Sequence, residues 1–153
     1  MNAETLITHL IGRGETVATA ESLTAGLVCA TLTEVPGSSA VVRGGLVVYA
    51  TDLKSKLAGV DEDLLAAQGA VHPEVAAQLA AGARDRCGAT WGLGLTGVAG
   101  PDGQDGVAPG TVHVGLAGPD VLTVRTLDLS GDRASVRAGA VSGAFALLGE
   151  HLA

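Results

Sequence analysis

Segments of helical and strand-like character alternate along most of this chain. Helical spacing, or small residues suited to a helix, occupies residues 3–12, 22–34, 51–59, 61–68, 73–87 and 132–152. Short apolar runs that predict strands occupy residues 16–20, 44–50, 90–96, 111–117 and 121–129, the last two forming a hairpin. Helices that alternate with strands cover both faces of a sheet. We therefore expect an α/β fold, a three-layer α/β/α sandwich with a mixed sheet of five to six strands.

The core of this sandwich has to be built almost without aromatic side chains. Hydrophobic residues make up 47% of the 153 positions, but aromatic residues only 2%. Alanine, valine and leucine must therefore fill the core, and the 23 glycines allow backbones to approach closely. A chain of this length buries about 70% of the surface that its unfolded form exposes. We expect residues 1–153 to form one domain.

Charge and composition exclude several classes of partner. The net charge is -7 at pH 7, whereas a surface that binds nucleic acid or an anionic membrane needs a basic footprint, so we expect neither partner. No apolar run approaches the ~20 residues that span a bilayer, and the expected location is cytoplasmic. Cys29 and Cys87 are too few for a disulfide framework. The four histidines do not lie at ligand spacing, so we predict no metal site.

The pattern G-x-G-x-x-G occurs at Gly92, Gly94 and Gly97, but not in the context of a dinucleotide-binding unit. In such a unit the third glycine opens a helix that binds the pyrophosphate, whereas Gly97 enters a loop broken by glycines and prolines. We predict no nicotinamide or flavin cofactor, and we interpret Gly92 and Gly94 as strand glycines against which a helix packs. The loop at 97–110 offers N–H groups for a phosphate or carboxylate, and its alternative interpretation is a long surface turn.

Ser22 stands directly after the first predicted strand, in the stretch TVATAESLTAG. As the N-cap of the next helix it would accept a hydrogen bond from a backbone N–H. As a nucleophile it would need a base, and a lysine of lowered pKa can serve. Lys54 lies one turn into the helix that follows Tyr49, so the three side chains meet at one rim if the first two strands are neighbours. Composition and spacing leave both interpretations open.

Two nearby residues have alternative interpretations of their own. Glu21 is interpreted as a structural carboxylate rather than as an acid catalyst. Thr51 and Lys54 lie three residues apart, which imitates the S-x-x-K spacing of another class of acyl-transfer enzymes. The residues alone do not decide which hydroxyl, if either, is a nucleophile.

Seven blocks of the sequence resemble, in order and spacing, the C-terminal domain of the competence-damage-inducible protein CinA. They are AESLTAG, PGSS, GGLVVYATDLKSKLAGV, GAVHPEVAAQLAAGA, LGLTGVAGPDG, PGTVHVGLA and LSGDRASVRAGAV. The resemblance covers nearly the whole chain, from about residue 5 to 150, and seven ordered blocks are far more specific than any single motif. The family includes the stand-alone nicotinamide-nucleotide amidohydrolases, also called NMN deamidases.

The resemblance implies an activity and the residues that carry it. The family hydrolyses the carboxamide of nicotinamide mononucleotide (NMN) to nicotinic acid mononucleotide and ammonia, in pyridine nucleotide salvage, without a metal or cofactor. Its serine nucleophile, tyrosine and lysine correspond to Ser22, Tyr49 and Lys54. The phosphate would be held by Ser38 and Ser39, by the loop from Thr96 to Gly103 that includes Gly97 and Gly100, or by Arg133 or Arg137, and Gly45 is a further expected substrate-binding residue. The alternative place for the two arginines is a subunit interface. NMN is the expected small-molecule partner, and a homodimer or higher homo-oligomer is expected.

The chain departs from the family pattern close to Ser22. Leu23 and Ala25 stand where the family usually has cysteine and glycine, and His72 stands in place of a serine. The methyl group of Ala25 is expected to trim the substrate pocket. Two rival hypotheses follow: an amidase that acts on a different nucleoside amide, and a catalytically idle domain that binds nucleotides or partner proteins.

Overall fold

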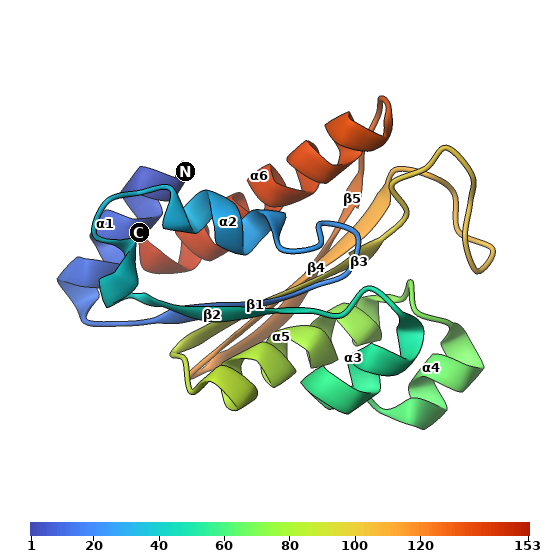
Figure 1. The fold of residues 1–153 in the computed structure, drawn as a ribbon, viewed down its shortest axis with the longest axis horizontal. Helices are drawn as coiled ribbons and strands as arrows, with labels where there is room; N and C mark the ends of the chain where they lie inside the picture. The colour runs from blue at the N-terminus through green and yellow to red at the C-terminus, as the bar shows by residue number, and fades with distance from the viewer.

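Helices cover both faces of a five-stranded sheet in the computed structural model, which describes all 153 residues. The helices are α1 (Ala3–Arg13), α2 (Leu27–Thr33), α3 (Thr51–Ala58), α4 (Glu62–Gln68), α5 (Pro73–Cys87) and α6 (Arg133–Leu152). The strands are β1 (Val17–Glu21), β2 (Val42–Val47), β3 (Trp91–Gly97), β4 (Thr111–Gly118) and β5 (Val121–Asp128). Figure 1 shows α1, α2 and α6 on one side of the sheet and α3, α4 and α5 on the other. The expected α/β sandwich with a mixed sheet is confirmed.

The order of the strands brings three strand ends to one edge. The order is β2-β1-β3-β4-β5, in which β1 runs parallel to both β2 and β3, while β3, β4 and β5 are antiparallel. The carboxyl ends of β1, β2 and β3 therefore lie side by side. The neighbouring positions of β1 and β2, which the common rim of Ser22, Tyr49 and Lys54 required, are confirmed.

Each face of the sheet has its own apolar core. Toward α1, α2 and α6 the cluster includes Val17, Leu93 and Leu148, together with the only Trp and Phe of the chain. Toward α3, α4 and α5 the residues are smaller, as Ala18 and Ala20 of β1 show. Small residues let the helices of this second face approach the strands, so alanine, valine and leucine do build the core as the composition predicts.

Close packing of α5 accounts for the first two glycines of the G-x-G-x-x-G pattern. A Cβ added at Gly94 would collide with the backbone of Ala76 and Ala80, because α5 packs directly on the strand. Gly97 ends β3, and a long loop to β4 follows it rather than a helix. The interpretation of Gly94 as a strand glycine for close helix packing is confirmed.

None of the helices is long and apolar enough to cross a bilayer.

The turn between β1 and α2 differs from the sequence-based expectation. The helix expected to start at residue 22 starts at Leu27, and its N-cap is Gly26. Ala25 and Gly26 both have left-handed backbone conformations, with φ of 48° and 97°, and these reverse the chain direction before the helix begins. The interpretation of Ser22 as the N-cap is therefore wrong, because Ser22 lies four positions before the cap residue.

Ala25 is the position of this turn where a substitution should raise stability. A side chain in the left-handed region costs about 1–2 kcal/mol, and the greater chain entropy of glycine in the unfolded state offsets part of the gain on its removal. We expect Ala25→Gly to raise the free energy of unfolding by about 0.5–1 kcal/mol, measured by urea denaturation. Gly26→Ala, the matched reverse change, should lower it. Equal or lower stability of Ala25→Gly would show that the turn holds no such strain.

Candidate active site

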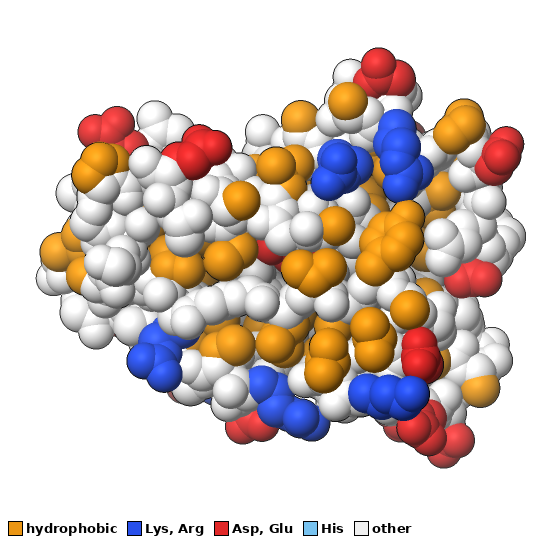
Figure 2. All heavy atoms as spheres, viewed as in Figure 1, with side chains coloured by type: hydrophobic (Ala, Val, Ile, Leu, Met, Phe, Trp, Pro, Cys, Tyr) orange, Lys and Arg blue, Asp and Glu red, His pale blue; other side chains and the backbone are white.

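A cleft of about 340 Å³ opens at the edge where β1, β2 and β3 end. In α/β sheets this edge is where ligands commonly bind, because the loops that follow the strands converge there. The lining residues are Ser22, Leu23, Tyr49, Ala50, Thr51, Gly97, Val98, Ala99, Gly100, Asp102, Gly103, Gln104 and Arg133. In Figure 2 basic side chains gather over the N-terminal half of α6, and apolar side chains lie below them along the β2 edge.

Ser22 extends β1 by one residue. Its N–H donates to Leu95 O at 3.0 Å, as in a continued strand, and the residue is 8% exposed. Side chains alternate between the faces of a strand. Because Ala18 and Ala20 pack toward α3 and α5, the side chain of Ser22 continues on that face. No group of the protein hydrogen-bonds its hydroxyl, which leaves the oxygen available to a ligand in the cleft.

Lys54 projects from α3 into the protein and is 1% exposed. Its Nζ donates to Val48 O at 2.9 Å and to Tyr49 O at 3.1 Å, and it forms no ion pair. Burial lowers the pKa of Lys54 from 10.5 to about 8, and the more distant carboxylate of Asp105 opposes this shift. Two bonds leave the third position on the nitrogen open, as an N–H in the ammonium or a lone pair in the neutral amine.

The register of β1 and β2 places this nitrogen beside Ser22. Glu21 pairs with Val47, and Val48 N donates to Glu21 O at 2.9 Å, so Ser22 and Val48 are the next neighbours across the two strands. In a continued parallel ladder, Leu23 N–H would donate to Val48 O. Lys54 Nζ takes that acceptor instead, which ends the ladder and places the amine at the position where β1 would otherwise donate, next to Ser22 in sequence. No direct hydrogen bond joins Ser22 Oγ to Lys54 Nζ or to Tyr49 OH.

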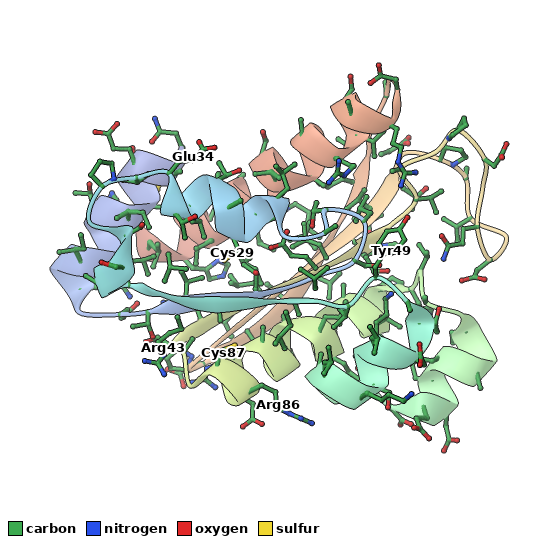
Figure 3. The ribbon with its side chains drawn as sticks, in the orientation of Figure 1. Cys29, Glu34, Arg43, Tyr49, Arg86 and Cys87 are labelled. Atoms are coloured by element: carbon green, nitrogen blue, oxygen red, sulfur yellow. The ribbon has the colours of Figure 1, made fainter.

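Tyr49 and Arg133 form the outer wall of the cleft. Tyr49 follows β2 and is 58% exposed, and Figure 3 shows it at the opposite end of β2 from Arg43. Arg133, the first residue of α6, donates to Tyr49 OH at 3.1 Å and to Gly100 O at 2.8 Å. The guanidinium therefore joins the β2 wall to the loop that follows β3, and it is the one basic group among the lining residues.

Several buried N–H groups around the cleft have no partner in the protein. Arg137 of α6 donates to Leu23 O and Thr24 O at 3.0 and 3.1 Å and so holds the turn after Ser22. The N–H groups of Leu23 and Thr24 make no hydrogen bond, although these residues are 4% and 0% exposed. In the loop after β3 the N–H of Ala99 is also unpaired. Unpaired buried N–H groups are rare, and they are the donors that an anion or oxyanion requires.

The structure brings together only some of the residues expected at the site. Ser22, Tyr49, Gly97, Gly100 and Arg133 line one cleft, whereas Lys54 is buried and reaches a lining residue only through its bond to Tyr49 O. Leu23 also lines it, whereas Ala25 is exposed and outside it, so the expectation that the Ala25 methyl trims the pocket is wrong.

Four residues expected to bind substrate do not line the cleft. Thr96 is 1% exposed, and its hydroxyl donates to Ala70 O at 2.7 Å. Gly45 lies within β2, where a Cβ would meet Thr19 and the side chain of Cys29. Ser38 and Ser39 precede β2 and Ser22 follows β1, so about 20 Å of parallel strand separates them.

Asp102, Gly103 and Gln104 line the cleft as part of the loop at 97–110, which the sequence offered as an anion site without singling these three residues out. Ala50, which follows Tyr49, also lines the cleft and was missed by the sequence reasoning. His72, in place of the usual serine, accepts Glu74 N at 3.1 Å through Nδ1 and thus caps α5.

Fold and site together define an α/β protein with a serine and a buried lysine at the carboxyl edge of a mixed sheet. The chain belongs to the CinA family, since the model of the CinA C-terminal domain matches residues 1–152. This membership confirms the resemblance carried by the seven sequence blocks. The family name specifies no activity.

Relatives and solved structures agree with this membership. A CinA-like protein of Frankia casuarinae is 53% identical over 144 residues, and one of Anaeromyxobacter sp. is 49% identical over 144, each over 94% of this chain. The chain spans about a third of these relatives, 33% and 35%. The competence/damage inducible protein CihA of Agrobacterium tumefaciens has a TM-score of 0.93 at 35% identity, over 98% of this chain and 92% of that one. A CinA superfamily protein of Escherichia coli has 0.94 at 30%, over 97% and 87%.

Proposed function

We propose that this chain is an amidohydrolase that converts NMN to nicotinic acid mononucleotide and ammonia through an acyl-enzyme on Ser22. The observation that carries the proposal is Lys54, which is buried without a carboxylate partner and donates to Val48 O, next to Ser22 across the β1–β2 ladder. With a pKa of about 8, a useful fraction of this amine is neutral near neutral pH and can accept a proton. A solvated lysine could not serve in this way.

Acylation uses Ser22, which lines the cleft, and the buried amine of Lys54. Neutral Lys54 takes the proton of Ser22, whose Oγ attacks the carboxamide carbon. The oxygen that becomes negative is stabilised by the unpaired N–H groups of Leu23 and Thr24. Arg137 holds the peptide that carries the Thr24 N–H, because it donates to Leu23 O. The Lys54 ammonium then returns the proton to the leaving nitrogen, so that ammonia departs and the acyl group stays on Ser22.

Deacylation repeats the same proton transfers with water. Lys54 takes a proton from a water molecule, which attacks the acyl carbon, and the proton passes to Ser22 Oγ as the carboxylic acid leaves.

Arg133, beside Tyr49 at the outer wall, binds the phosphate of the substrate together with the N–H of Ala99. We further propose that the chain acts as a homodimer, which light scattering tests directly.

Incubation of the purified protein with NMN, with ammonia and nicotinic acid mononucleotide both measured, tests the activity. Stoichiometric release of the two products is expected. Binding of NMN without turnover would instead support the rival hypothesis of an idle nucleotide-binding domain. Faster turnover of another nucleoside amide would keep the acyl-transfer chemistry and change the substrate.

Arg133→Ala is expected to raise the KM for NMN by about 10–100-fold, because a charge-assisted hydrogen bond contributes about 1.5–3 kcal/mol. The kcat should change much less, since the phosphate is bound equally in substrate and transition state. Steady-state kinetics of ammonia release measure both constants. The control is Ser39→Ala, at the opposite sheet edge, for which no change is expected. An equal rise of KM in Ser39→Ala would place the phosphate site there.

A further inference from the structure

We propose that Glu21 is a positioning residue for Ser22, because its buried carboxylate ties the start of α2 to the end of β1. This inference rests on the proposed role of Ser22 as the nucleophile. Glu21 is 0% exposed, although it precedes a residue that lines the cleft. Its side chain does not line the cleft, so any effect on chemistry has to act through the backbone around Ser22.

Neutral donors alone satisfy the carboxylate of Glu21. Its Oε1 accepts Val28 N at 2.8 Å, and its Oε2 accepts Cys29 N at 3.0 Å and Thr19 Oγ1 at 2.9 Å. No lysine, arginine or histidine pairs with it. A buried carboxylate is costly to desolvate unless it is fully hydrogen-bonded, and the positive end of a helix is a favourable place for it.

The helix that Glu21 holds has no cap of its own. The N-cap of α2 is Gly26, which lacks a side chain, so the N–H groups of the first turn need a distant acceptor. Glu21 provides it from seven and eight residues away in sequence. An ordinary local cap would stabilise the first turn of α2 but would not fix the position of the helix relative to β1. Glu21 does both, because its own backbone belongs to β1.

The turn at 22–26 is therefore clamped at both ends. On its first side, Ser22 N donates to Leu95 O at 3.0 Å, and Ala25 N donates back to Ser22 O at 3.0 Å. On its far side, the helix start is held by Glu21. Because side chains alternate along β1, the carboxylate anchors the α2 face while the hydroxyl of Ser22 is presented on the Lys54 face. A shift of α2 would therefore move the N–H groups of Leu23 and Thr24, which are the proposed hydrogen-bond donors to the oxyanion.

Glu21→Gln tests this inference while it keeps the size of the side chain. The glutamine amide places an NH2 group against Val28 N or Cys29 N, so one of the two bonds is lost. We expect kcat for NMN to fall about 10–100-fold with KM within about 3-fold, since a misplacement of about 1 Å costs that much in rate. Labelling of Ser22 by a fluorophosphonate, followed by mass spectrometry, should slow to the same extent.

A matched control separates positioning from helix stability. Asp61→Asn changes a carboxylate that caps α4 through Asp63 N at 2.9 Å, away from the cleft, and both rates should stay at the wild-type level. All rates are measured at a temperature where circular dichroism shows each variant fully folded. Glu21→Asp keeps the charge but has a shorter side chain, so its labelling and turnover rates should lie between those of the wild type and Glu21→Gln. If Glu21→Gln does not fold, Glu21→Asp is measured in its place.

Each outcome decides a different claim. If folded Glu21→Gln is labelled and hydrolyses NMN at the wild-type rates, the positioning role is overturned. The same result in folded Glu21→Asp overturns it where that variant is used instead. Labelling of wild-type Ser22 without hydrolysis of NMN would refute the proposed substrate, while the labelling rates of the Glu21 variants would still decide the inference. If Ser22 of the wild type reacts with neither reagent, the nucleophile assignment fails and the positioning role falls with it.

Discussion

Ser22→Ala is expected to lower kcat for ammonia release from NMN by at least about 10³-fold, because the variant has no oxygen to form the acyl-enzyme. The melting temperature should stay close to that of the wild type, since the hydroxyl forms no hydrogen bond inside the protein and its residue lines the cleft. Ammonia and nicotinic acid mononucleotide are measured at saturating NMN, and circular dichroism checks the fold. The loss should appear in kcat and kcat/KM alike.

Thr51→Ala is the matched control, because Thr51 also carries a hydroxyl and is also a lining residue of the cleft. Thr51 begins α3 and lies on the same helix as Lys54, three residues before it. It should retain most of the activity. Full activity in Ser22→Ala together with loss in Thr51→Ala would move the nucleophile to Thr51 and restore the S-x-x-K interpretation that the sequence left open.

Local patterns were sufficient to predict the elements of the fold. Proline at the start and glycine after the end predict α5 from Pro73 to Cys87, and the structure has these bounds. The rim of Ser22, Tyr49 and Lys54 needed one further condition, that β1 and β2 be neighbours, which strand order satisfies. Such adjacency depends on how the whole sheet is assembled, so the sequence could state the condition but not prove it.

Long-range hydrogen bonds account for what the sequence could not predict. The start of α2 was expected at residue 22, where a serine imitates a cap, but the acceptor for its first turn is Glu21 on the neighbouring strand end. The end of β2 was expected at residue 50, yet Lys54 takes the acceptor that the ladder would use. In both cases a side chain takes the hydrogen-bonding position that a backbone group or a local cap would otherwise fill. The periodicity of apolar residues in the sequence does not show such a replacement.

The resemblance predicted the position of residues along the chain better than their position in space. Ser38 and Ser39 belong to a matching block, but parallel strands carry the start and the end of β2 to opposite edges. Arg133 comes from the far end of the sequence and reaches the cleft because α6 starts beside the loop after β3. A family block shows that a segment matters without showing which edge of the sheet it serves.

Lys54→Met is expected to lower kcat by about 10²–10⁴-fold, the usual contribution of a general base. For the wild type, kcat/KM should rise with pH and level off above about 8, where the free enzyme holds Lys54 as the neutral amine. The variant should lose this rise. A wild-type profile that keeps rising to pH 10 would mean that the base has the pKa of an ordinary lysine.

The stability of the protein should report the same titration independently of any substrate. In the unfolded chain the pKa of Lys54 returns to about 10.5, so between pH 8 and 10.5 the unfolded state binds more protons than the folded one. The free energy of unfolding of the wild type, relative to Lys54→Met, should therefore be constant below about pH 8 and rise by about 3 kcal/mol up to pH 10.5, at about 1.4 kcal/mol per unit of pKa shift. Urea denaturation across this range measures the difference. A difference independent of pH would show that Lys54 titrates alike in both states, and Ser22 would then have no base at neutral pH.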